Sequence, residues 1–161
     1  MGIIINFGVS GRIFKCAENF HKLAELALKQ DNNLAISSAC IYGLTAELYL
    51  KSLDANTKLK NQSSGTITDG EIYSELRGHK LDTLLSSVNN PIIAEVESYF
   101  SNQNLNIENL CLECKDYFEH ARYSYELTGA HVYDVTKVKL LADNLRSSIY
   151  LAHKIQPPRL V

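Results

Sequence analysis

Residues 34–54, LAISSACIYGLTAELYLKSLD, decide the fold that we predict for this chain. The stretch holds many good helix formers, and apolar side chains cover much of the circumference of the helix that they would form. A helix without a broad polar face is buried on several sides, so we expect it at the centre of a bundle. On this helix Glu47 and Lys51 are spaced i, i+4, close enough on one face to pair.

Helical spacing of apolar residues continues on both sides of this central stretch. Asp134 is a candidate cap for the last helix, which ends before Pro157. The predicted helices cover residues 12–30, 34–54, 79–88, 92–100, 106–127 and 135–152, with a further short candidate at 71–77. The fold class is therefore all-α, a single-domain bundle of five or six helices, and Ile3 to Phe7 is a weak strand candidate.

The bundle is expected to span residues 12–155, between an extended N-terminal segment at 1–11 and a C-terminal tail at 156–161. Within it, residues 54–70 have almost nothing to bury and predict a long exposed loop. Composition agrees with one packed core, since 45% of the 161 residues are hydrophobic and 21% are charged. Cysteines within helical patterns and the lack of a signal sequence or a membrane-length apolar run predict a cytoplasmic protein that does not enter a membrane.

Two cysteines, Cys111 and Cys114, have the spacing found in one half of a zinc site. The sequence offers no second half, and both cysteines lie on the apolar face of the helix at 106–127, where a free cysteine behaves as a small hydrophobe. We therefore expect no bound metal and no cofactor. The net charge, 16 basic minus 18 acidic residues or −2, argues against a protein that coats nucleic acid non-specifically.

The helix at 106–127 also carries Glu119, Arg122 and Glu126 at i, i+3 and i+7. The arginine can contact either acid, which would make a ladder of surface ion pairs. Alternatively, Arg122 lies at the border of the apolar face and positions an anionic ligand or a partner subunit.

The last helix has a second stripe, made of Asp143, Arg146, Tyr150 and His153, which all project from one side. An arginine can bind a phosphate while a histidine transfers a proton, and these two groups suffice for metal-free cleavage of RNA. A solvated face is the ordinary meaning of such a charged stripe.

Three stretches of the chain resemble the HEPN-type domains, small helical bundles named for nucleotide binding in higher eukaryotes and prokaryotes. The stretches are Ala46-Glu47-Leu48-Tyr49-Leu50-Lys51-Ser52-Leu53, Gly78-His79-Lys80-Leu81-x-x-Leu84-Leu85 and the arginine-tyrosine helix near 122. Together with the flanking helices they span about residues 12–155. The resemblance implies the helical bundle and leaves activity open, because some members are enzymes and others are binding modules.

Many members of that family are ribonucleases with an Arg-x4-6-His motif, which Arg146 and His153 match with six residues between them. The resemblance thus implies two alternatives. One is a metal-independent endoribonuclease, of the toxin or phage-defence type, whose Arg146 and His153 meet across a homodimer. The other is a non-catalytic module that binds a nucleotide, RNA or protein. Its expected contact residues are Glu47, Lys51, His79, Arg122, Glu126 and Tyr150. A cognate antitoxin or nucleotidyltransferase would be the partner of the toxin.

Overall fold

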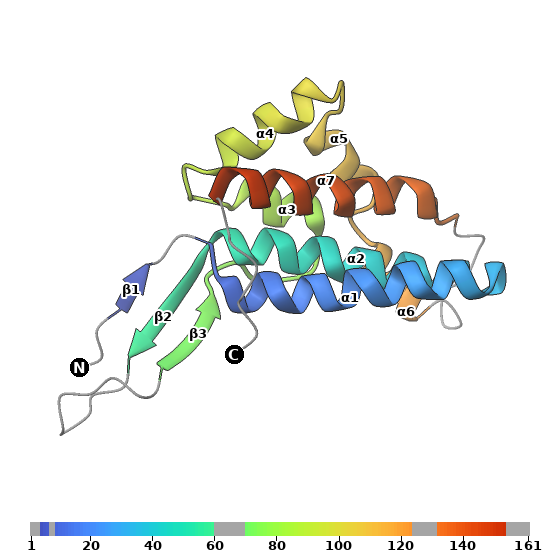
Figure 1. The fold of residues 1–161 in the computed structure, drawn as a ribbon, viewed down its shortest axis with the longest axis horizontal. Coiled ribbons are helices and arrows are strands. Elements are labelled where there is room, and N and C mark those ends of the chain that lie inside the picture. The colour runs from blue at the N-terminus through green and yellow to red at the C-terminus, as the bar shows by residue number, and fades with distance from the viewer. Residues whose placement is uncertain (1–3, 7–8, 60–69, 124–131, 154–161) are drawn as a thin grey trace.

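A computed structural model describes residues 4–6, 9–59, 70–123 and 132–153 of the chain. Three long helices, α1 (Gly11–Gln30), α2 (Ala35–Leu53) and α7 (Val135–His153), run along the long axis of the molecule (Figure 1). A short 3-10 turn at Asn32–Leu34 joins α1 to α2, and the two helices pack side by side. The helical bundle predicted from the sequence is confirmed.

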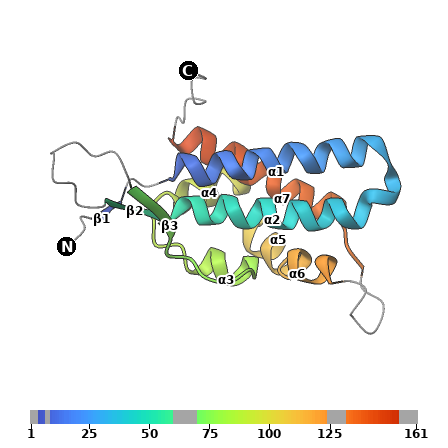
Figure 2. The same ribbon diagram turned by 90° about the horizontal axis from the view of Figure 1, so that it is seen from below.

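The central position predicted for α2 is also confirmed. This helix contacts α1 and α7, and it contacts the short helices α3 (Leu81–Ser86) and α6 (Tyr117–Arg122) as well. Figure 2 shows α1 on one side of α2 and α3 and α6 on the other. Eleven residues of α2 are buried, against four in α1, because only α2 has neighbours around most of its circumference.

Two further helices, α4 (Ile93–Asn102) and α5 (Ile107–Glu113), complete the bundle. The single helix predicted over residues 106–127 is wrong, because the chain turns between α5 and α6. At this turn the carbonyl of Lys115 accepts a hydrogen bond from the Leu81 amide, 3.4 Å away on another segment. Tertiary contacts of this kind override local helix propensity. The predicted end of this helix, at residue 127, lies outside the described residues.

A three-stranded antiparallel sheet lies at one end of the bundle, in the order β1 (Ile4–Asn6), β2 (Ala55–Leu59), β3 (Gly70–Ser74) (Figure 1). Ile4 pairs with Lys58, and Thr57 pairs with Ile72. The weak strand candidate near the N-terminus is thus confirmed, within the segment expected to be extended.

Two expectations for this region are wrong. Residues 55–59, placed in the predicted loop at 54–70, form β2, and the segment at 71–77 forms most of β3 instead of a short helix. The strands obtain their backbone hydrogen bonds from each other, so pairing between distant segments decides their conformation. Residues 60–69 of the predicted loop lie outside the described part of the chain.

Side-chain caps fix the starts of two of the three long helices, α1 and α7. The Ser10 hydroxyl accepts a hydrogen bond from the Ile13 amide at the start of α1. At the start of α7, the Asp134 carboxylate accepts one from the Lys137 amide, which confirms the predicted cap. Among the helices described, none combines the length and the apolar character that crossing a bilayer requires.

Candidate functional site

The structure brings together four of the residues predicted to contact a ligand or partner. Glu47 and Lys51 lie on α2, His79 lies in the link between β3 and α3, and Arg122 ends α6. Glu47 is buried, with 3% of its surface exposed, and both its partners are cations or potential cations. The Lys51 ammonium donates to Glu47 Oε1 at 2.8 Å, which confirms the i, i+4 pair.

His79 is the second partner of the Glu47 carboxylate. Its Nδ1 atom lies 3.1 and 3.0 Å from Glu47 Oε1 and Oε2. Because an ionised carboxylate only accepts hydrogen bonds, Nδ1 carries the hydrogen, and Nε2 is left for another partner. The preceding Gly78 has φ +88°, a conformation that favours glycine, and this turn directs His79 toward α2. The positive φ angle therefore explains why a glycine directly precedes His79.

Phe118 of α6 joins the Glu47–His79 pair to Arg122. The His79 and Phe118 ring centroids are 5.4 Å apart. The Arg122 guanidinium lies 4.8 Å from the centroid of the Phe118 ring and 4.4 Å from that of Tyr123. Arginine stacks on aromatic faces in this way through cation–π attraction. His79, Phe118, Arg122 and Tyr123 thus form a row of rings and a guanidinium, which we call the α6 stack.

The α6 stack is partly open to solvent. Arg122 is exposed, Tyr123 is 40% exposed and the His79 side chain is 42% exposed. The expected contact of Arg122 with Glu119 is not formed, and Glu126 lies outside the described residues. Within 9–59, 70–123 and 132–153 no carboxylate lies within ion-pair distance of Arg122.

Close packing against α2 holds α6 in place. The Cys40 thiol donates to the Phe118 carbonyl at 3.5 Å. Burial raises the pKa of this thiol, and the nearby charge of Arg122 opposes that shift. At Gly43 an added Cβ would lie 2.9 Å from the Phe118 amide nitrogen. The glycine therefore lets the two helices approach closely.

The residues expected to cleave RNA are placed differently. Arg146 donates from Nε and Nη2 to Glu18 Oε1 of α1, at 3.1 and 3.0 Å. Burial lowers the pKa of the guanidinium, but the hydrogen bonds and charge of Glu18 outweigh it and the pKa is raised. Tyr150 is 40% exposed on the same helix. His153 ends α7, and its side chain lies outside the described part of the structure. Arg146 is thus held within the monomer by an ion pair.

Cys111 and Cys114 are both fully buried in the core. Burial raises the pKa of both thiols, to about 12 for Cys114, so both stay protonated at neutral pH. This agrees with their interpretation as small hydrophobic residues.

A second cluster was not found from the sequence. His21 and Glu25 of α1 lie close to Asp143 of α7, and the sequence indicates only Asp143, as part of a charged stripe. The i, i+4 spacing of His21 and Glu25 was the available signal, but their partner is more than 100 residues away.

Models of protein families, curated proteins and solved structures were all compared with this chain, and none of them matches it.

Proposed function

We propose that this chain is a HEPN-like module that binds single-stranded RNA or a nucleotide at the α6 stack without cleaving it. The observation that carries the proposal is the Arg122 guanidinium, stacked on Phe118 and Tyr123 and without a carboxylate partner among the described residues. Arginine planes and aromatic rings are the groups on which unstacked bases stack, and the guanidinium edge can bind phosphate. Glu47 and Lys51 neutralise each other beneath the stack.

The family part of the proposal is supported by where the resembling stretches lie. Glu47 and Lys51 come from the first stretch, Gly78 and His79 from the second, and Arg122 from the third. Direct contacts join them into one cluster. If the chain shares the HEPN-type fold, the three resembling stretches should meet in space, and these contacts agree with that expectation.

The ribonuclease alternative has weaker support. A catalytic arginine must be free to contact a phosphate, whereas Arg146 donates twice to Glu18, whose side chain is only 14% exposed. Cleavage would require this ion pair to open. The same helix still presents exposed apolar residues, including Leu151 at 64% exposure. This exposed surface suits a homodimer through α7. From the sequence we also retain a cytoplasmic location and, for the ribonuclease alternative, an antitoxin or nucleotidyltransferase as the partner.

Fluorescence anisotropy with a labelled single-stranded RNA of about 12 nucleotides, competed with ATP and AMP, tests the proposal. Arg122→Ala should weaken binding about tenfold or more and make it less dependent on salt, because one stacking and phosphate contact is lost. Arg122→Lys should recover only part of the affinity, since it keeps the charge but not the plane. Arg12→Ala, which removes an exposed arginine of α1, is the matched control and should bind like the wild type.

Two results would overturn the proposal. The first is equal affinity of wild type and Arg122→Ala for every ligand, including the case in which neither binds. The second is cleavage of RNA in EDTA by the wild type that is lost in His153→Ala, which would establish the ribonuclease alternative.

A further inference from the structure

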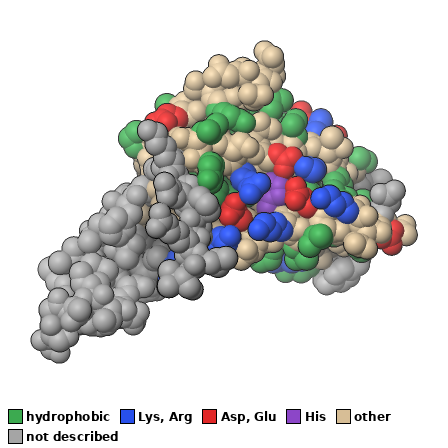
Figure 3. All heavy atoms as spheres, viewed as in Figure 1, with side chains coloured by type: hydrophobic (Ala, Val, Ile, Leu, Met, Phe, Trp, Pro, Cys, Tyr) green, Lys and Arg blue, Asp and Glu red, His purple; other side chains and the backbone are tan. Residues whose placement is uncertain are grey.

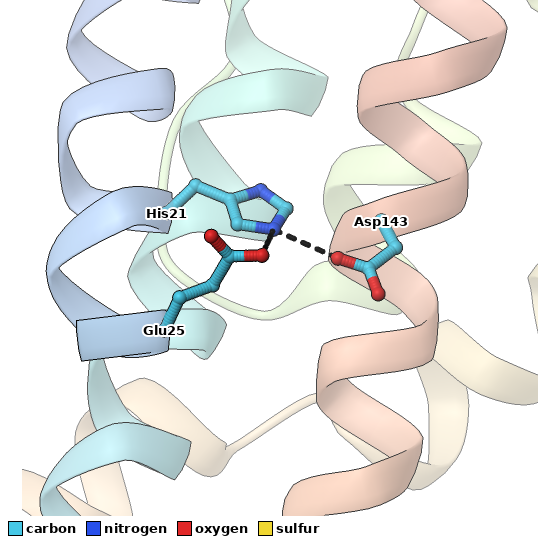
Figure 4. Close-up of side chains that lie close together, drawn as sticks. All are labelled: His21, Glu25 and Asp143. Carbon is cyan, nitrogen blue, oxygen red and sulfur yellow. Dashed lines mark hydrogen bonds and ion pairs between the residues drawn. The ribbon is translucent and has the colours of Figure 1, made fainter. Parts of the chain in front are cut away.

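A buried histidine and two carboxylates meet between α1 and α7, on the side of α2 away from the α6 stack. His21 is 3% exposed, and its Nε2 atom lies 2.8 Å from Asp143 Oδ1 and 3.9 Å from Glu25 Oε1. Figure 4 shows the imidazole and both carboxylates pointing toward one another across the two helices. One ligand atom from each residue lies within 4.8 Å of the other two.

The His21 ring is held in a fixed orientation. The Tyr49 hydroxyl of α2 lies 3.1 Å from Nδ1, and the Tyr42 ring packs edge-on at a centroid distance of 5.6 Å. Tyr49 can donate to Nδ1 in one tautomer of the ring or accept from it in the other. In the second tautomer the Nε2 lone pair is directed at the carboxylates. A hydrogen bond at the far nitrogen is how proteins orient histidines that bind metals.

The spacing of the three ligand atoms suits a small divalent ion. Zinc lies about 2.0–2.2 Å from nitrogen and oxygen ligands, so two ligands of a tetrahedral site are about 3.4 Å apart. The observed separations from His21 Nε2, 2.8 and 3.9 Å, lie on either side of that value. Small rotations of the Glu25 and Asp143 side chains, which are 38% and 39% exposed, would bring both separations to that value. A tetrahedral ion would keep one position for water.

Charge also favours a cation here. Asp143 Oδ2 pairs with Lys139, but Oδ1 faces His21, so one oxygen remains for an ion. The other nearby cation, Arg146, is paired with Glu18. Figure 3 shows acidic and basic side chains gathered on the face where α1 and α7 meet. Since Glu25 and Asp143 are 38% and 39% exposed, an ion can reach the histidine from solvent between them.

We propose that His21, Glu25 and Asp143 form a binding site for Zn²⁺ or another first-row divalent ion. The ion replaces the proton between His21 Nε2 and Asp143 Oδ1, and the ring proton moves to Nδ1, where it is donated to Tyr49. Imidazole with two carboxylates is a donor set that such ions accept. Lys139 competes with the ion for Asp143. This site does not depend on RNA binding, so the two proposals can fail separately.

The test is titration of the protein with Zn²⁺ by calorimetry and with Co²⁺ by visible absorption, in a Cys16→Ser background that removes an exposed thiol. We expect one ion per chain, and a Tm higher by roughly 5–10 °C at a 100-fold excess over the dissociation constant. Glu25→Gln should weaken binding at least tenfold, and Lys139→Gln should tighten it. Glu97→Gln, on an exposed acid of α4, is the matched control and should bind as the parent does.

Glu25 is the residue of choice for the decisive variant, because its partial exposure leaves folding intact where a His21 variant would disturb the core. Absence of Zn²⁺ and Co²⁺ binding in the parent protein would overturn the site. So would Glu25→Gln binding with the parent's affinity, which would place any bound ion elsewhere.

Discussion

Replacing Gly43 with alanine tests whether close packing of α2 and α6 builds the α6 stack. The new Cβ would lie 2.9 Å from the Phe118 amide nitrogen and 3.3 Å from its Cα. Both atoms belong to the backbone of α6, so no side-chain rotation can relieve the contact. Either α6 moves away from α2 or the contact stays compressed.

The expected size of the effect follows from two opposing terms. Alanine in place of glycine inside a helix favours folding by about 1 kcal/mol. Overpacking of a well-filled interior costs about 1–3 kcal/mol. The net result is a free energy of unfolding lower by about 0–2 kcal/mol. Gly11→Ala separates the two terms, because an added Cβ there meets nothing within 4 Å, and this variant should be neutral or stabilised by up to about 1 kcal/mol.

Urea unfolding followed by far-ultraviolet circular dichroism measures both variants against the wild type. We expect Gly43→Ala to be less stable than Gly11→Ala by up to about 3 kcal/mol, because only Gly43→Ala carries the cost of the contact. We also expect weaker RNA binding by Gly43→Ala, because a displaced α6 carries Phe118 and Arg122 with it. Equal stability of the two alanine variants would refute the packing argument.

Two further predictions concern α7. Burial would raise the pKa of Asp143, but hydrogen bonds from His21 and Lys139 outweigh it and the pKa is lowered. Asp143 thus adds stability above its unfolded pKa of about 3.9 that is lost as the pH falls through the lower folded value. The Tm deficit of Asp143→Asn should therefore shrink from pH 7 to pH 3, and a constant deficit would contradict this. Sedimentation at micromolar concentration should show a dimer that Leu151→Asp dissociates, whereas a monomeric wild type would exclude the α7 interface.

The sequence predicts the parts of this fold that depend on local patterns. Apolar spacing places α1, α2 and α7 within one residue of their observed starts, because each helix buries one stripe or more. The Glu47–Lys51 pair follows from helical spacing alone. These features need no knowledge of which segments meet.

The features that the sequence does not predict all depend on contacts between distant segments. β2 forms because its partners, β1 and β3, pair with it on both sides. The turn between α5 and α6 is fixed from Leu81, more than 30 residues earlier. The apolar pattern of α1 does not predict the burial of His21, because that burial depends on contacts with Tyr49 and Asp143 across two helix interfaces.

The geometry of α2 lets the two proposed sites be separated by experiment. Successive residues of a helix are about 100° apart, so Glu47 and Tyr49 point to nearly opposite sides. Glu47, with Gly43 one turn before it, faces α6, whereas Tyr49 faces His21 of α1. A displacement of α6 by Gly43→Ala should therefore weaken RNA binding and leave Zn²⁺ affinity within about twofold of the parent, since sites without shared partners respond independently. Loss of both activities together would mean that α2 moves as a whole, and that its two faces cannot be treated as separate sites.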